Sequence, residues 1–254
     1  KDRFHLTDEV KEMILADVGG LRDRTPMAGL IEYGTINAKA LFYDDAVKRQ
    51  VSSLESILSA ERFPEIREMM KSKGMRTGFT CLFYGAPGTG KTETVYQLAK
   101  RTGRDLITAD VTKIKSFWVG ESEKNIKELF SKYKRCVKES KMTPILLFNE
   151  ADAIFGIRME GADRAVEKME NSIQNIILQE MESLDGILIA TTNMTQNLDK
   201  AFERRFLYKI RFEVPSVEVK SKIWHSMVPD LDEEQTRKLA SMFNFSGGQI
   251  ENVS

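Results

Sequence analysis

Short apolar runs alternate with longer amphipathic segments along most of the chain. The apolar runs have the length of buried strands and lie at residues 80–84, 106–109, 144–148, 187–192 and 207–212. Before and between them, apolar side chains recur every three or four positions, which places them on one face of a helix. The helices are expected at about residues 45–60, 64–73, 93–101, 121–139 and 163–184. This alternation predicts an α/β fold, a doubly wound parallel sheet with helices on both faces.

Both ends of the chain differ in pattern from its middle. A predicted helix from Thr7 to about Asp17 is followed by residues 21–40, which show no clear period. After Pro215 a helical segment with a polar face begins, and the chain ends within what is predicted to be a helix. We therefore assign residues 1–40 to an N-terminal helix and linker, residues 41–214 to the α/β domain, and residues 215–254 to the start of a truncated helical domain.

The charge balance gives no support to a nucleic-acid or membrane partner. The chain has 38 basic and 38 acidic side chains, so its formal net charge is zero. No apolar run is long enough to cross a membrane and the amino end is not a signal peptide, so we expect a soluble, cytoplasmic protein. Cys81 and Cys136 lack metal-ligand spacing and are predicted to be small buried hydrophobes rather than a disulfide.

One glycine-rich stretch predicts nucleotide binding. It lies between a predicted strand and a predicted helix and consists of Gly85, Ala86, Pro87, Gly88, Thr89, Gly90, Lys91 and Thr92. In that context backbone N–H groups and the amino end of the helix bind phosphate. Lys91 is expected to be an exposed charge that reaches the β and γ phosphates, and the Thr92 hydroxyl is expected to bind Mg²⁺.

A second candidate cluster follows the apolar run at residues 145–148. Asn149, Glu150 and Asp152 come directly after this run. The carboxyl ends of parallel strands meet at one edge of a sheet, where the glycine-rich stretch also lies. These side chains therefore predict a site for a metal ion and a reacting water beside the bound phosphates.

The two clusters together resemble the paired nucleotide motifs of the AAA+ ATPases. Three later stretches strengthen the resemblance: Thr191-Thr192-Asn193 is similar to the sensor at a strand end, Ala201-Phe202-Glu203-Arg204-Arg205-Phe206 to the arginine-finger box, and Phe245-Ser246-Gly247-Gly248 to the adenine-side turn of the lid. Gln249, where DNA-loading branches carry an arginine, favours the AAA-type module. The resemblance covers residues 79–254 and implies a P-loop sheet of order 5-1-4-3-2 with a helical lid, here truncated.

The resemblance also implies roles for individual residues. It implies an ATPase that converts ATP and water to ADP and phosphate with Mg²⁺, with Glu150 as the base that polarises the attacking water. Asn193 would hold the same water, while Arg204 and Arg205 would reach the nucleotide of a neighbouring subunit. On the residues alone, Asn193 is also typical of a turn after a strand, and adjacent arginines are typical of a solvated surface.

The triplet Phe117-Trp118-Val119 is apolar at a position where a loop should be polar. This position is similar to the family's pore loop, which grips an extended polypeptide that passes through a ring. The alternative is that Trp118 covers the hydrophobic core.

Asn149 stands where the family has an aspartate that orders water on Mg²⁺. The amide keeps the shape of that side chain without its charge, which leaves Mg²⁺ to Thr92, the phosphates and water. The implied function is a homo-oligomeric ring, a hexamer by resemblance, that remodels or threads a protein. Two alternatives stay open: a nucleotide-dependent switch or scaffold with weak hydrolysis because of Asn149, and, disfavoured by the zero net charge, a nucleic-acid loader.

Overall fold

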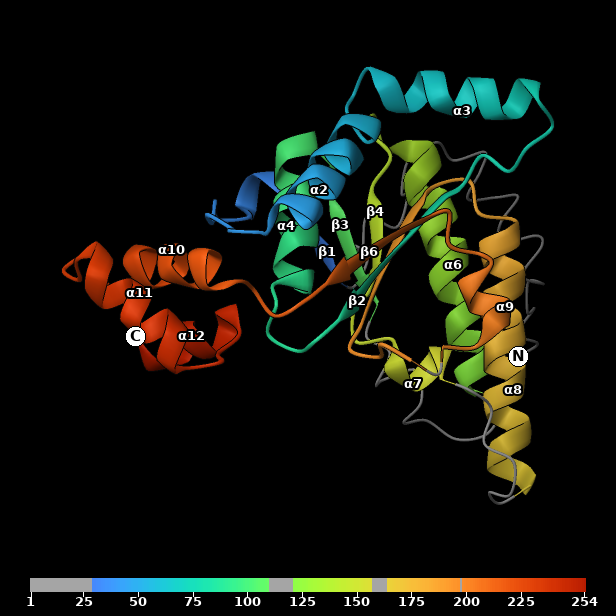
Figure 1. Cartoon of the computed structure of the whole chain (residues 1–254). Helices are drawn as coiled ribbons and strands as arrows, with labels where there is room; N and C mark the ends of the chain where they lie inside the picture. The colour runs from blue at the N-terminus through green and yellow to red at the C-terminus, as the bar shows by residue number, and fades with distance from the viewer. Residues whose placement is uncertain (1–28, 110–120, 157–163, 197) are drawn as a thin grey trace, which may run out of the picture.

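The computed structural model describes residues 29–109, 121–156, 164–196 and 198–254 (Figure 1). The predicted helix at residues 7–17 and the triplet Phe117-Trp118-Val119 lie outside these residues. Within them, a six-stranded sheet forms the centre of the molecule, with helices on both faces and a further group of helices at the carboxyl end. The predicted α/β fold is confirmed.

Five strands run parallel in the order that the resemblance implies. β2 (Phe79–Gly85) lies between β5 (Ile187–Thr192) and β6 (Tyr208–Phe212). On the other side of β5, β4 (Ile145–Phe148) pairs with it and with β3 (Leu106–Ala109). Numbered along the chain from β2, this order reads 5-1-4-3-2. The carboxyl ends of β2, β4 and β5 therefore open onto one edge of the sheet.

A short antiparallel strand extends the sheet beyond β3. β1 (Leu30–Ile31) pairs with β3, so that Leu30 lies opposite Ile107, and a 3-10 turn, η1 (Tyr33–Thr35), follows it. The stretch predicted to be a linker thus contains regular structure. A strand of two residues is too short to show a periodic pattern in the sequence. Only its pairing with β3 identifies β1 as a strand.

Helices cover both faces of the sheet. α2 (Asp45–Ile57) and α4 (Lys91–Thr102) pack on one face, and α6 (Glu121–Glu139) and α8 (Arg164–Glu182) pack on the other (Figure 1). The shorter helices of this part are α3 (Arg62–Ser72), α7 (Asp152–Phe155) and α9 (Lys200–Glu203).

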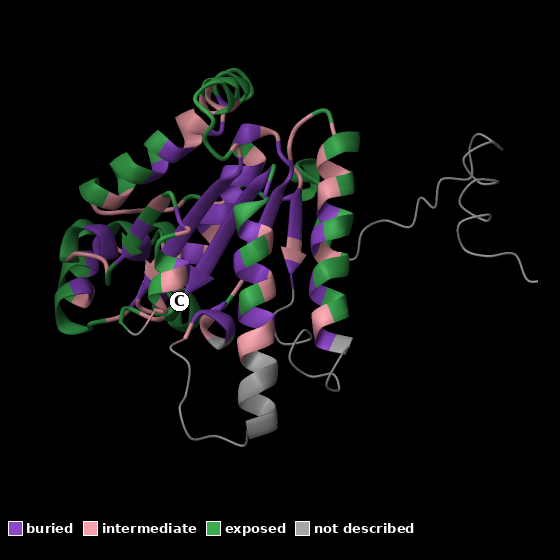
Figure 2. Ribbon diagram, turned by 90° about the vertical axis from the view of Figure 1, so that its right-hand side faces the viewer, coloured by how far each residue is buried: buried purple, intermediate pink, exposed green. Residues whose placement is uncertain are grey.

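Each face of the sheet has its own apolar core, and the strands between the two cores are buried (Figure 2). Successive residues of β2 serve opposite faces, as expected for a strand. Leu82 belongs to the core that includes Phe130 of α6 and Ile177 of α8. Cys81 belongs to the core that includes Leu98 of α4. A strand buried on both faces reads as a continuous apolar run, which explains why the sequence pattern located β2, β4 and β5.

Two composition-based predictions can be compared with the structure. Cys81 is buried and Cys136 is half-buried, and across the described residues no disulfide joins them. In the same part of the chain, no helix is both long and apolar enough to cross a membrane.

The last three helices form a separate group beside the sheet (Figure 1). They are α10 (Val217–Met227), α11 (Glu233–Met242) and α12 (Gly247–Val253), and they share a small core that contains Trp224 and Ile250. Each begins at a side-chain cap that satisfies a backbone N–H of the first turn. The caps are Ser216, Asp232 and Ser246. We refer to α10–α12 as the lid.

Candidate active site

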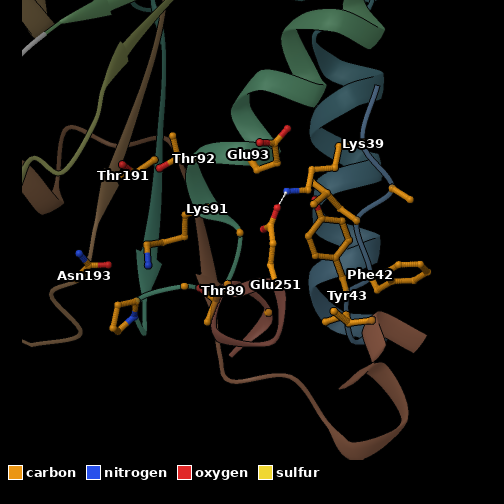
Figure 3. A pocket seen from close by; sticks show the side chains of 18 of the residues that line it. Lys39, Phe42, Tyr43, Thr89, Lys91, Thr92, Glu93, Thr191, Asn193 and Glu251 are labelled. Atoms are coloured by element: carbon orange, nitrogen blue, oxygen red, sulfur yellow. Dashed lines mark hydrogen bonds and ion pairs between the residues drawn. The ribbon is translucent and has the colours of Figure 1, made fainter. Parts of the chain in front are cut away.

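A cleft of about 320 Å³ opens where the carboxyl edge of the sheet meets the lid (Figure 3). Four parts of the chain line it: the glycine-rich stretch after β2, Glu150 with the end of β5, residues 39–43, and the lid. Of the predicted site residues, those that line the cleft are Pro87, Gly88, Thr89, Gly90, Lys91, Thr92, Glu150, Asn193, Gly247 and Gly248. Tertiary folding thus brings together motifs that are widely separated in the sequence.

Two glycines let the backbone of the loop follow a path that a side chain would block. Gly85 has a φ of 134°, and a Cβ there would lie 1.9 Å from the carbonyl oxygen of Phe212. Gly88 has a φ of 70°, and a Cβ there would lie 2.4 Å from Ser246 Oγ of the lid. The loop then leads directly into the amino end of α4, where free N–H groups favour an anion.

Lys91 is buried in this structure, which corrects the prediction of an exposed charge. Its side chain is 6% exposed, and its Nζ donates hydrogen bonds to the backbone oxygens of Gly85 at 2.9 Å and Ala86 at 2.6 Å. Burial lowers the pKa of the Lys91 ammonium, and the nearby carboxylates of Asp152 and Glu150 act in the opposite direction. The start of the loop therefore curls round the ammonium of Lys91.

Asn149 links the phosphate-loop threonine to the end of β5. Its Oδ1 accepts hydrogen bonds from Thr92 Oγ1 at 2.7 Å and from Thr191 Oγ1 at 2.8 Å. Asn149 therefore lies where the sequence placed it, beside the residue predicted to bind Mg²⁺. A single amide oxygen that accepts two hydroxyl hydrogens is a well-satisfied acceptor, and an aspartate of the same shape could accept both bonds.

Glu150 follows β4 in an unusual backbone conformation. Its φ is 51°, in the left-handed region that residues with a Cβ rarely adopt. Its backbone N–H donates to Thr191 Oγ1 at 3.1 Å, and its side chain is exposed to the cleft. Surrounding contacts must hold such a conformation, and this kind of local strain is concentrated at functional sites.

Asp152 holds Asn193 at the edge of the cleft. The backbone N–H of Asn193 donates to Asp152 Oδ1 at 2.9 Å, and the Thr192 hydroxyl donates to the same oxygen. Asn193 itself is exposed and lines the cleft (Figure 3). The sequence predicted Asp152 at the strand end but did not predict its contact with Asn193. The only signal for that contact was its position two residues after Glu150.

Neither predicted finger arginine is among the described residues that line the cleft. Arg204 is exposed at the carboxyl end of α9. Arg205 is held within its own chain: its guanidinium forms an ion pair with Glu182 and donates to the backbone oxygen of Ala201 at 3.4 Å. The two adjacent arginines therefore occupy different surroundings, which their sequence does not distinguish.

Residues 39–43 form a wall of the cleft that the sequence analysis did not assign to the site. Lys39 forms an ion pair of 2.5 Å with Glu251 of α12 (Figure 3). The Tyr43 hydroxyl lies 2.8 Å from Thr94 Oγ1, and burial raises the pKa of Tyr43 to about 12. The available signal was the apolar run of residues 41–43, which was assigned only as the start of the α/β domain.

The lid also contacts the phosphate loop directly. The backbone N–H of Gly248 donates to the backbone oxygen of Gly88 at 2.8 Å. Gly247 and Gly248 lie at the start of α12, so the lid turn and the loop form one continuous rim of the cleft.

The comparison with protein families agrees with this geometry. Residues 81–214, more than half of the chain, match the family described as "ATPase family associated with various cellular activities (AAA)". The chain belongs to the AAA family. The matched residues include the phosphate loop, Glu150, Asn193 and both arginines of the box. The predictions of family, fold and ATPase class are confirmed at the level of the family.

Several named AAA relatives align with most of this chain. The chain is 25% identical to Fidgetin-like protein 1 of Drosophila melanogaster, over 98% of this chain and 45% of that protein. It is 29% identical to the Proteasome-associated ATPase of Thermobifida fusca, over 84% of this chain and 39% of that protein. It is 28% identical to the Vesicle-fusing ATPase of Caenorhabditis elegans, over 73% of this chain and 24% of that protein. The chain thus spans less than half the length of these relatives.

Proposed function

We propose that the cleft binds ATP with Mg²⁺ and that the chain hydrolyses it to ADP and phosphate. One observation carries the proposal: Asn149 joins Thr92 of the phosphate loop to Thr191 of β5 through hydrogen bonds of 2.7 and 2.8 Å, with Glu150 next in sequence. Glu150 and Asn193, the proposed base and sensor, line the same cleft as the phosphate loop. These are the parts that phosphoryl transfer to water requires.

The phosphate loop would bind the nucleotide through backbone N–H groups and the Lys91 ammonium. Lys91 donates to the oxygens of Gly85 and Ala86. On binding, phosphate oxygens would replace these carbonyl oxygens, and the hydrogen bonds would gain the strength of a charged acceptor. Gly247 and Gly248 of the lid, with the wall at residues 39–43, would hold the adenine end.

Glu150 and Asn193 would act on the attacking water. Glu150 is exposed to the cleft and can accept a proton from a water in line with the γ phosphate. Asn193 would orient the same water, and Asp152 fixes the backbone of Asn193 through the bond of 2.9 Å. Asp152 is thus a positioning residue for the sensor.

The residues beside Asn149 fit a Mg²⁺ ion that takes most of its ligands from the nucleotide and from water. Across the described residues, no group of three or more His, Cys, Asp or Glu side chains is arranged to hold a metal. Thr92 offers a hydroxyl oxygen, and Asn149 would contact metal-bound water. When bound, Mg²⁺ would neutralise the charge of the β and γ phosphates.

Asn149→Asp is expected to raise the hydrolysis rate and tighten the dependence on Mg²⁺. The carboxylate would accept the same two threonine bonds, and a charged acceptor contributes about 1.5–3 kcal/mol, or roughly tenfold to a hundredfold in affinity or rate. A magnesium titration of steady-state ATPase activity measures both quantities. Asn149→Ala, which removes the acceptor, should lower the rate and is the control.

The opposite result for Asn149→Asp would favour the alternative function. Unchanged or slower turnover with the same magnesium midpoint would mean that the site is built around the amide, because an added carboxylate would repel the negative charge of Glu150. The chain would then act as a nucleotide-dependent switch or scaffold with weak hydrolysis.

We further propose that the protein acts as a ring, by resemblance a hexamer, on a polypeptide. Two features support this assignment. Arg204 is exposed and lies outside its own cleft, as a finger for a neighbour's nucleotide must. Relatives include a proteasome-associated ATPase, whose name links an ATPase to a protein assembly. The zero net charge gives no support to a nucleic-acid substrate. The cytoplasmic location stays a prediction.

The ring and its substrate can be tested together. The ATPase rate per subunit should rise with protein concentration, because a site completed by a neighbour's arginine exists only in the oligomer. Denatured casein should raise the rate further, and this stimulation should disappear in Trp118→Ala, which tests the predicted pore loop. Tyr33→Ala, which removes an aromatic that is 47% exposed at a sheet edge, is the matched control.

Two results would count against the ring and threading proposal. A rate per subunit that stays constant while light scattering shows assembly would contradict catalysis between subunits. A fall in melting temperature of several degrees in Trp118→Ala would mean that Trp118 belongs to the core.

A further inference from the structure

α7 is a single helical turn that lies between the cleft and the arginine box. It begins at Asp152, two residues after Glu150, and ends at Phe155. The arginine box lies about fifty residues later, on α9 and the segment that follows it. The contacts of α7 extend in both directions, toward the residues that would contact the water and toward those that would contact a neighbouring subunit.

On the cleft side, α7 is bonded to the end of β5. The Ala151 backbone N–H donates to the Thr191 oxygen at 2.9 Å. Asp152 then accepts from the backbone N–H of Asn193 and from the Thr192 hydroxyl. A shift of the carboxyl end of β5 therefore moves Asp152, the first residue of α7.

On the other side, α7 is bonded to the segment that leads into α9. The Asp199 backbone N–H donates to the Phe155 oxygen at 2.9 Å, and Gly156 forms an isolated antiparallel bridge with Leu198. Asp199 is also the cap of α9, because its carboxylate accepts from the Ala201 N–H at 2.6 Å. The start of α9, whose carboxyl end leads into Arg204 and Arg205, is therefore fixed by the end of α7.

Aromatic packing strengthens this second contact. The ring of Phe155 lies 4.6 Å from that of Phe202 and 5.5 Å from that of Phe206, measured between ring centroids. Phe155 and Phe202 are fully buried and Phe206 is 4% exposed. Phe202 and Phe206 flank Arg204 and Arg205 in the sequence, so the backbone that carries both arginines is held on either side by Phe155.

A glutamine of α8 forms hydrogen bonds with the backbone of α7 and of the residue that follows it. Gln174 is 7% exposed, and its Nε2 donates to the backbone oxygens of Ile154 at 2.8 Å and Gly156 at 3.2 Å. Packed interiors are stiff, and α7 is bonded to β5, to the segment before α9 and to α8. A displacement at the end of β5 is therefore transmitted through α7 to α9.

We propose that Phe155 is a positioning residue for Arg204, through which the nucleotide-binding side of one subunit sets the arginine that it presents to its neighbour. Phe155 is fully buried and is not among the described residues that line the cleft. It acts through α9, so its loss should impair a subunit as a donor of the arginine while leaving its own base and sensor competent. The proposal rests on the proposed function in which Arg204 acts between subunits.

Phe155→Leu tests the proposal by separating the two roles of a subunit. Alone, the variant should bind ATP like the parent and hydrolyse it roughly tenfold to a hundredfold more slowly, the size of loss that follows a small misplacement of a catalytic group. Mixed with Glu150→Gln subunits, which retain a normally placed Arg204, it should recover activity. Mixed with Arg204→Ala subunits, which supply no arginine, it should not recover.

A control variant separates positioning from packing. Phe130→Leu makes the same substitution at a fully buried phenylalanine of the same core, whose ring packs against that of Phe148 of β4. It should lower the melting temperature by a similar amount while hydrolysis stays near the parent rate. If Phe155→Leu is much less stable than Phe130→Leu, Phe202→Leu breaks the same ring contact from the α9 side and should give the same pattern of recovery.

Three outcomes would overturn the proposal. Parent-like hydrolysis by Phe155→Leu would remove the need for the residue. Failure of Glu150→Gln to restore Phe155→Leu, when the same partner restores Arg204→Ala, would place the defect in the variant's own site. If Glu150→Gln fails to restore Arg204→Ala as well, although mixed assemblies form, then action between subunits is itself wrong and the proposed function fails first.

Discussion

Lys91→Ala is expected to abolish the stabilisation of the protein by Mg-ATP. In the parent, ligand at about a hundred times its Kd adds about 2.7 kcal/mol to the free energy of unfolding, or roughly 5–10 °C in melting temperature for a chain of this size. Without the ammonium, the phosphate loop loses its charged donor to the β and γ phosphates. Thermal shift with and without Mg-ATP measures the difference directly.

The burial of Lys91 requires a second variant. Because the side chain is 6% exposed and bonded to two loop carbonyls, Lys91→Ala removes packing as well as charge. Lys91→Met keeps an unbranched chain of similar length without the charge. Both variants should lose the ATP-dependent shift, and Lys91→Met should keep a melting temperature closer to that of the parent without ligand. A shift as large as the parent's in either variant would show that the phosphate loop is wrongly assigned.

Arg204→Ala is expected to bind ATP normally and to hydrolyse it about 10³-fold more slowly, the scale of charge stabilisation by such an arginine. Arg204 is exposed and lies outside its own cleft, whereas Arg205 is paired with Glu182, so we expect Arg204 to contribute more. Nucleotide titration and steady-state turnover at high protein concentration separate binding from hydrolysis. Arg237→Ala, at an exposed lid arginine paired with Glu233, is the control and should hydrolyse like the parent.

Mixing identifies the subunit in which Arg204 acts. Arg204→Ala keeps Glu150 and Asn193 intact, while Glu150→Gln keeps Arg204 intact. A mixed assembly therefore contains sites with a working base next to a working arginine, and some activity should return. No recovery in assemblies that demonstrably contain both variants would argue that Arg204 does not act between subunits.

The sequence alone was sufficient for the parts of the protein that depend on local pattern. The strands at residues 106–109 and 187–192 and the helix at residues 121–139 coincide with β3, β5 and α6, because burial imposes a regular spacing of apolar side chains. The phosphate loop was also predictable, since its eight residues are contiguous and its chemistry requires glycine at set positions.

Family resemblance extended this prediction to residues that are distant from one another in the sequence. Asn149 could be placed near Lys91 from the shared edge of a parallel sheet, whereas Asn193 was assigned to the same site only through the resemblance. The structure brings Asn193 to the cleft and joins Asn149 to Thr92 across 57 positions of sequence. The roles of Asn149 and Asn193 in hydrolysis are proposals.

Tertiary structure alone decided the environment of each side chain. Lys91 is buried because the loop closes on its ammonium, and Arg205 is held because Glu182 of α8 lies within reach of it. Lys39 joins the cleft because it meets Glu251 of the lid across 212 positions of sequence. Spacing along a chain reports which face a side chain shares with its near neighbours. The distances between remote segments, which set burial and ion pairing, are fixed only when the sheet and lid pack together.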